Sequence, residues 1–150
     1  MALGKSLKQW LAGAPNAIVA FVIGRFGKSP AGAQLLEVRG RTSASIQIVP
    51  VNPVEVGGNR FLFAPRGETQ WVKNFRVAGE GVLRVGDKRE PILGREVPDS
   101  DKPEIIRAYL DRWYWQVGSY VDVPKDATLE QLAGIAPNHP VFHIHSKEIA

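Results

Sequence analysis

The stretch VEVGGNRFLFAP, Val54–Pro65, decides the fold of this chain. Two short runs, in which apolar residues alternate with others, lie on either side of Gly57-Gly58-Asn59. Their apolar positions are Val54, Val56, Phe61 and Phe63. Alternation with a period of two is typical of a strand that buries one face, and a glycine pair followed by Asn is a strong turn signal. The stretch therefore predicts an antiparallel hairpin.

Further strands are predicted on both sides of this hairpin. Apolar runs bounded by turn residues indicate them. They are AQLLEVRGR (33–41), Ile46–Val51, the two arms of GVLRVGDKREPILGREV (81–97) around Gly86-Asp87, and PVFHIH (140–145). Many short strands joined by tight turns predict an antiparallel barrel.

Three helices are predicted between these strands. WVKNFRVAG (71–79) forms a short helix that Gly79 ends. A longer helix follows Ser100 or Asp101, either of which could cap it, and keeps apolar residues at helical spacing as far as Gly118. LEQLAGIAP (129–137) is the third. The predicted fold class is therefore α+β, mainly antiparallel β with flanking helices.

The composition is that of an ordinary globular protein. With 150 residues, 44% hydrophobic and 23% charged, the chain suits a single domain spanning residues 1–150. The absence of cysteine excludes disulfides, thiolate nucleophiles and cysteine-bound metals, and it fits a cytoplasmic location. A formal net charge of +4 favours anionic partners. No Lys/Arg block or nucleic-acid motif is present, so nucleic acid is not predicted as a partner.

Residues 1–33 are predicted to be a helical extension of the domain. Leu3, Leu7, Trp10 and Leu11 share a helical spacing, while two lysines lie on other faces. The apolar run 17–24 is too short to span a membrane. We expect the segment to cover the core; the alternative is peripheral contact with a lipid surface, which would make the protein membrane-associated.

Several common catalytic motifs are missing from the chain. It has no phosphate-binding Walker loop, no dinucleotide fingerprint, no nucleophile elbow and no HExxH zinc motif. His143 and His145 would share one face of a strand, which suits two metal ligands. Because no third ligand lies near them in the sequence, no metal site is predicted.

Two turns indicate a ligand that carries phosphate. RGRTSAS (39–45) combines two cations, a glycine and three hydroxyls at a strand junction, and such donors suit a phosphate. APRGETQWVKNFR (64–76) sets Arg66 and Gly67 beside Trp71, with Lys73 close behind. A flexible turn, an aromatic plate and several cations together predict an anionic, planar cofactor.

The aromatic cluster from Tyr109 to Tyr120 cannot lie entirely in the core. Successive residues of a helix point about 100° apart. We expect Tyr109 and Trp113 to pack in the core, which leaves Tyr114 or Trp115 as the wall of a ligand pocket.

At these residues the chain resembles the deazaflavin-dependent nitroreductases, split β-barrel proteins found chiefly in actinobacteria. The resemblance runs from about Leu35 to the C-terminal strand. The matching residues are Gly40, Arg41, Ser43, Pro50, Gly57, Gly58, Gly67, Trp71 and Asn74. The chain departs from the family pattern at Thr42 and Gln47, where basic residues are usual, and at Ala44, where glycine is usual.

The resemblance implies a split β-barrel that binds 8-hydroxy-5-deazaflavin (coenzyme F-420), or less readily flavin mononucleotide (FMN). Its activity would be hydride transfer to an electron-poor small molecule such as a quinone, an enone or a nitro compound. Arg41, Thr42 and Ser43 would receive the phosphate. The full cofactor set is Arg41, Thr42, Ser43, Gln47, Pro50, Val51, Ala64, Pro65, Arg66, Gly67, Gln70, Trp71 and Asn74.

Position in the long helix, rather than a motif, selects the remaining site residues. Trp115 is predicted to form a substrate wall, and Tyr114 or Tyr120 to donate a proton. The departures at Thr42 and Gln47 favour one alternative, a non-catalytic barrel that binds fatty acid or another lipid. Another alternative is an FMN-using relative of the same fold, which would bind its phosphate in a similar way. Split barrels often pair through their sheets, so a homodimer is also considered.

Overall fold

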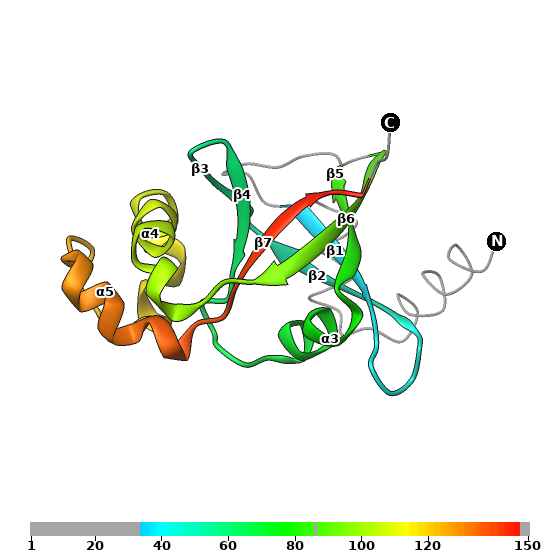
Figure 1. The fold of residues 1–150 in the computed structure, drawn as a ribbon, viewed down its shortest axis with the longest axis horizontal. Coiled ribbons are helices and arrows are strands. Elements are labelled where there is room, and N and C mark those ends of the chain that lie inside the picture. The colour runs from blue at the N-terminus through cyan, green and yellow to red at the C-terminus, as the bar shows by residue number, and fades with distance from the viewer. Residues whose placement is uncertain (1–33, 86, 148–150) are drawn as a thin grey trace.

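The computed structural model describes residues 34–85 and 87–147 (Figure 1). The predicted helical extension, residues 1–33, lies outside the described residues. Seven strands form one antiparallel sheet in the order β2-β1-β5-β6-β7-β4-β3. Their bounds are β1 Gln34–Arg39, β2 Ile46–Val51, β3 Val54–Val56, β4 Asn59–Phe63, β5 Glu80–Val85, β6 Lys88–Glu96 and β7 Val141–Ser146.

The sheet curls into a barrel that is split at one place. Its two edge strands, β2 and β3, are consecutive in the chain and are separated only by Asn52 and Pro53. Within the described residues no pairing joins these edges, so the barrel stays open where the chain turns from one edge to the other. This confirms the predicted antiparallel split barrel.

The hairpin that suggested this fold is present. Val54 pairs with Phe61, and Val56 with Asn59. Gly57 and Gly58 between them have φ angles of 59° and 84°. A two-residue hairpin turn of type I′ requires positive φ at both central positions, which glycine adopts without steric cost.

The helices also follow the sequence, with one correction at a helix start. Helix α3, Gln70–Ala78, ends at Gly79, whose φ is 69° and whose N–H donates to the Phe75 carbonyl. Helix α4, Pro103–Val117, is not capped by Ser100 or Asp101 as predicted. Those residues belong to the short 3-10 helix η2, Asp99–Asp101, and Lys102 occupies the capping position. Proline is favoured at the first helical position because its φ is already helical, so Pro103 sets this start.

Helix α5, Leu129–Ile135, completes the helical part of the fold. Thr128 and Gln131 form a reciprocal capping box at its start. Short 3-10 helices follow α4 and α5, namely η3 Gly118–Tyr120 and η4 Ala136–Asn138. Figure 1 shows α4 and α5 at one side of the curled sheet, whereas α3 lies beside the strands of the barrel.

Two buried clusters of the described residues meet along β4. The barrel cluster contains Leu62 together with Phe75 from α3 and Phe142 from β7. The helical cluster packs Phe63 against α4 and α5. Adjacent strand residues point to opposite faces, so Leu62 enters one cluster and Phe63 the other. Tyr109 and Trp113, 2% and 1% exposed, belong to the helical cluster as predicted.

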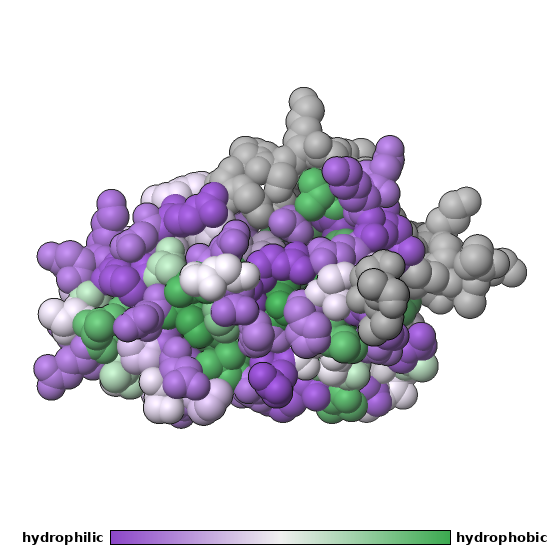
Figure 2. All heavy atoms as spheres, turned by 45° about the horizontal axis from the view of Figure 1, so that its top comes forward, coloured by the Kyte–Doolittle hydropathy of each residue, from purple (hydrophilic) through white to green (hydrophobic). Residues whose placement is uncertain are grey.

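One face of the molecule is mainly polar. Figure 2 shows hydrophilic residues over most of one face, with apolar residues in small groups between them. Among the described residues, no helix is both long enough and apolar enough to cross a membrane.

Candidate functional site

A pocket of about 560 Å³ lies where the two clusters meet, beside the split of the barrel. It is lined by β2, by the loop between β4 and α3, and by the C-terminal half of α4 with η3. Six predicted site residues line it: Pro50, Val51, Pro65, Arg66, Trp71 and Tyr120. Its volume is in the range of pockets that bind small molecules.

Trp71 provides an aromatic wall of the pocket. It stands in the first turn of α3, and its ring centroid is 6.0 Å from that of Phe142 and 6.5 Å from that of Phe75. The side chain is only half-buried, although the residues behind it are fully buried. One side of the indole therefore packs on the core, and another side faces the pocket.

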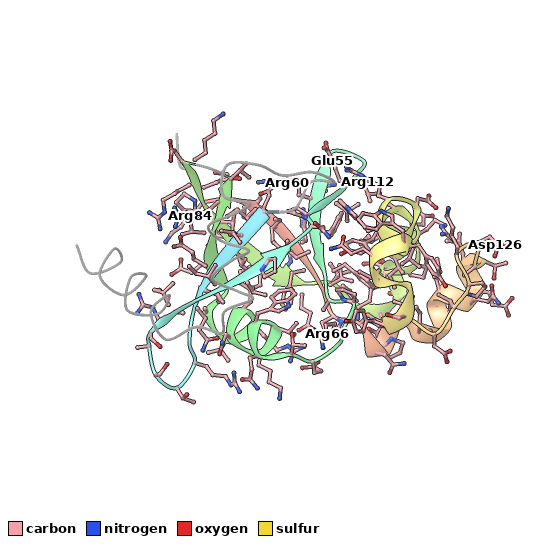
Figure 3. The ribbon with its side chains drawn as sticks, turned by 180° about the vertical axis from the view of Figure 1, so that it is seen from behind. Glu55, Arg60, Arg66, Arg84, Arg112 and Asp126 are labelled. Atoms are coloured by element: carbon pink, nitrogen blue, oxygen red, sulfur yellow. The ribbon has the colours of Figure 1, made fainter. Side chains whose placement is uncertain are left out.

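Arg66 brings a cation to the pocket. Its guanidinium carbon lies 4.8 Å from the centroid of the Tyr120 ring, a cation–π contact between the β4–α3 loop and η3. Figure 3 shows Arg66 between α3 and α4. The turn depends on Gly67, whose φ is 79° and whose N–H donates to the Ala64 carbonyl at 3.1 Å. Ala64 itself is buried, so it shapes the loop rather than the pocket surface.

Thr69 contributes a hydroxyl that the protein does not use. It precedes α3 in the capping position, yet its side chain makes no capping bond. Its Oγ1 is buried without a hydrogen-bond partner among the described residues, and Thr69 lines the pocket. An unpaired buried polar group costs about 1–3 kcal/mol, and a ligand that paired with it would recover that energy.

Another part of the pocket wall is polar, and the sequence did not predict the residues that form this polar corner. The Asn52 Nδ2 donates to the Tyr109 hydroxyl and to the Gln116 Oε1, both at 3.3 Å. All three residues line the pocket. Burial raises the pKa of the Tyr109 hydroxyl, and the hydrogen bond from Asn52 only partly opposes this.

Arg41, Gln47 and Asn74 form a hydrogen-bonded cluster next to the pocket. The backbone N–H and the Nη1 of Arg41 donate to the Asn74 Oδ1 at 3.0 and 2.8 Å. The Asn74 Nδ2 donates to the Gln47 Oε1 at 2.8 Å. Gln47 shares a face of β2 with Val49, and Asn74 is one helical turn beyond Trp71. The cluster thus continues the site along β2 and α3.

The turn before β2 uses its hydroxyls internally. The Ser43 and Ser45 Oγ atoms are 2.8 Å apart, and Thr42 is exposed. Ala44 has a φ of 62°, the left-handed region that favours glycine. This is the position at which the resembled family usually has glycine.

Gln70, Tyr114 and Trp115 do not line the pocket. Gln70 is an exposed first residue of α3. The Tyr114 hydroxyl donates to the Val123 carbonyl at 2.8 Å, while Trp115 is 74% exposed and its indole N–H donates to the Arg112 carbonyl. Their proposed roles stay predictions, but the structure does not bring them to the other site residues.

The histidine pair has a packing role. The His143 ring stacks on Phe61 with centroids 5.1 Å apart, and burial lowers its pKa. Within residues 34–85 and 87–147, no group of three His, Cys, Asp or Glu side chains could hold a metal ion.

Comparison with known proteins identifies the fold. No family model and no curated protein matches the sequence. A solved F420-H2 dependent reductase is 19% identical, with a TM-score of 0.53 over 76% of this chain and 94% of that chain. A domain-swapped dimer is 18% identical, with a TM-score of 0.54 over 88% and 100%. A Listeria innocua protein, provisionally named a pyridoxamine 5'-phosphate oxidase, is 13% identical, with a TM-score of 0.50 over 90% and 94%. The chain therefore has a split β-barrel fold, which it shares with these solved structures.

Proposed function

We propose that this protein is an oxidoreductase that binds 8-hydroxy-5-deazaflavin (coenzyme F-420) in the pocket beside the split. Its second substrate would be a quinone, an enone or a nitro compound. The observation that carries the proposal is the pocket itself, which combines the Trp71 wall, the Arg66 cation and the unpaired Thr69 hydroxyl. The fold shared with an F420-H2 dependent reductase supports it.

The pocket residues fit a planar ring that carries polar edges. Aromatic and aliphatic side chains, Trp71, Val49 and Val51 among them, offer apolar walls to the ring faces. The buried Thr69 hydroxyl and the Arg66 guanidinium offer hydrogen bonds at its edge. Apolar walls with a few directed polar groups are typical of cofactor sites.

Arg41 is our candidate for the anionic tail of the cofactor. Its Nη1 is bonded to Asn74, so the guanidinium is held in one orientation while its remaining N–H groups stay exposed. Gln47, which stands where the resembled family has a cation, is bonded to Asn74 and adds no charge. We expect each lost charge-assisted hydrogen bond to weaken tail binding by about 1–3 kcal/mol.

When bound, the reduced deazaflavin supplies the hydride. The chain would hold the ring against Trp71, pair the polar edge with Thr69 and Arg66, and exclude water from between the apolar walls. Tyr120, which is half-exposed and contacts Arg66, is the predicted proton donor that lies at the pocket.

A titration tests this proposal. Purified protein is titrated with the deazaflavin coenzyme and, separately, with FMN, while cofactor fluorescence is followed. We expect micromolar or tighter deazaflavin binding in the wild type and about tenfold weaker binding in Arg66→Ala. Arg112→Ala is the matched control, because Arg112 makes a similar cation–π contact, 4.5 Å from the Trp113 ring, outside the pocket.

The outcomes separate the alternatives. Tighter binding of FMN than of deazaflavin would favour the FMN-using relative, which the fold shared with the Listeria innocua protein supports. No binding of either cofactor at millimolar concentration would overturn the proposal and favour the lipid-binding alternative, which displacement of a fluorescent fatty acid would check. Sedimentation of the same samples would test the homodimer, which the fold shared with a domain-swapped dimer supports.

A further inference from the structure

We propose that Asn52, Tyr109 and Gln116 form the subsite that holds an oxygen of the electron acceptor, with the Tyr109 hydroxyl as hydrogen-bond donor. The inference rests on the proposed function for the identity of the second substrate. The polar corner itself is defined by the geometry of the described residues.

The hydroxyl proton of Tyr109 is available to a bound molecule. Its hydroxyl accepts a hydrogen bond from Asn52 at 3.3 Å, but no described residue accepts the Tyr109 proton. The residue is 2% exposed and lines the pocket. Buried tyrosine hydroxyls normally have at least one hydrogen-bond partner. Asn52 fills that role here, so the hydroxyl proton is left for an acceptor that enters the pocket.

The Tyr109 hydroxyl stays protonated, so it can donate a hydrogen bond, and the packing of its ring holds it in place. Because burial raises its pKa, the hydroxyl keeps its proton at neutral and moderately alkaline pH. The ring packs between Phe63 and Trp113, with centroids 4.6 and 4.8 Å away. Asn52, at the split between β2 and β3, fixes the direction of the hydroxyl from the other side.

The polar corner offers neutral hydrogen-bond donors beside apolar side chains. Gln116 accepts from Asn52 through Oε1, which leaves its amide N–H₂ as a second donor. Arg66 is the only charged side chain among the described residues that line the pocket, and the corner itself is neutral. Two neutral donors suit the oxygen of a ketone, quinone or nitro group, whereas Val51 and Val117 offer apolar contact to its carbon skeleton.

The experiment compares two probes that share a carbon skeleton, of which only one carries carbonyl oxygens. Menadione (2-methyl-1,4-naphthoquinone) and 2-methylnaphthalene are titrated into cofactor-free protein, and binding is followed by NMR chemical shifts. Since the chain has no cysteine, the quinone cannot add to a thiol. We expect Tyr109→Phe to weaken menadione binding about fivefold and to leave 2-methylnaphthalene binding unchanged.

Two further variants keep the test independent of folding. Gln116→Met alters an exposed position and should weaken menadione binding by a similar factor. Ser119→Ala removes an exposed hydroxyl beside the pocket that does not line it, and should change neither affinity. Equal losses for both probes, an unchanged menadione affinity in Tyr109→Phe and Gln116→Met, or no menadione binding by the wild type at millimolar concentration would overturn the inference.

Failure of the proposed function gives a different result. If the wild type binds no deazaflavin but Tyr109→Phe still loses its preference for the quinone, the subsite stands and the cofactor assignment fails. If deazaflavin binds equally to the wild type and to Tyr109→Phe while the quinone preference is unaffected, the cofactor site stands and the subsite fails. With reduced deazaflavin present, Tyr109→Phe should raise the KM for menadione.

Discussion

Replacing Ala44 by glycine should stabilise the protein. Ala44 is exposed and has a φ of 62°, so its Cβ is strained by the backbone and contributes no core packing. The left-handed conformation costs an L-residue about 1–2 kcal/mol. The greater freedom of glycine in the unfolded chain takes back about 0.5–1 kcal/mol. We therefore expect Ala44→Gly to raise the free energy of unfolding by about 0–1.5 kcal/mol.

The matched control is the same substitution where the backbone is helical. Ala133 is exposed within α5, Leu129–Ile135. Glycine there should lower the free energy of unfolding by about 1 kcal/mol, because it adds backbone entropy to the unfolded chain without relieving strain. Urea unfolding at pH 7.5, followed by circular dichroism, measures both variants, and the m-value shows whether the unfolded state has changed.

The sign of the Ala44→Gly effect tests the reasoning. A loss of stability comparable to that of Ala133→Gly would mean that the turn before β2 is not strained at Ala44. The turn at 39–45 would then not require glycine at this position.

Three further predictions concern buried positions. Thr69→Val removes an unpaired buried hydroxyl, so it should raise the free energy of unfolding by about 1–2 kcal/mol, measured by urea unfolding without ligand. The same variant should bind deazaflavin more weakly. A loss of stability would show that the hydroxyl is paired. Gly94→Ala should lower the free energy of unfolding by about 1–3 kcal/mol, because an added Cβ would overlap the Phe75 ring. An unchanged urea midpoint would contradict this prediction. Burial lowers the pKa of His139, so the folded state favours the neutral ring. The contribution of His139 to the free energy of unfolding should therefore be fully present at pH values above the unfolded pKa of about 6.5. As the pH falls below that value, the free energy of unfolding should decrease by at most about 1.4 kcal/mol per pH unit. Urea midpoints at pH 7.5 and 5.5 measure this, and the same decrease in His139→Gln would refute it.

Local physics explains why much of the fold was predictable. The hairpin at Gly57 and Gly58 and the helix end at Gly79 depend on backbone conformations that glycine adopts readily, and both occur as predicted. Strands β1 and β2 were predicted from short apolar runs bounded by turn residues, and both are present. The start of α4 was missed because several capping candidates precede Pro103, and proline set the boundary instead of Ser100 or Asp101.

The candidate site was predictable only where its residues lie close together in the sequence. The loop from Pro65 to Trp71 brings three predicted residues to the pocket, and Pro50 and Val51 come from one strand end. Thr69 was missed because a threonine before a helix normally uses its hydroxyl as a cap, whereas here it makes no such bond.

The sequence by itself determined the strands and the turns, because these depend on residues that are close together in the chain. For the same reason it determined that Arg66 and Gly67 lie near Trp71. Tertiary structure decided which aromatic residues enter the pocket. Packing of α4 against β3 and β4 places Tyr109 beside Asn52, 57 residues away in the chain, and turns Tyr114 toward Val123. Helical periodicity gives the relative directions of these side chains, but only the packed barrel shows which direction faces the pocket.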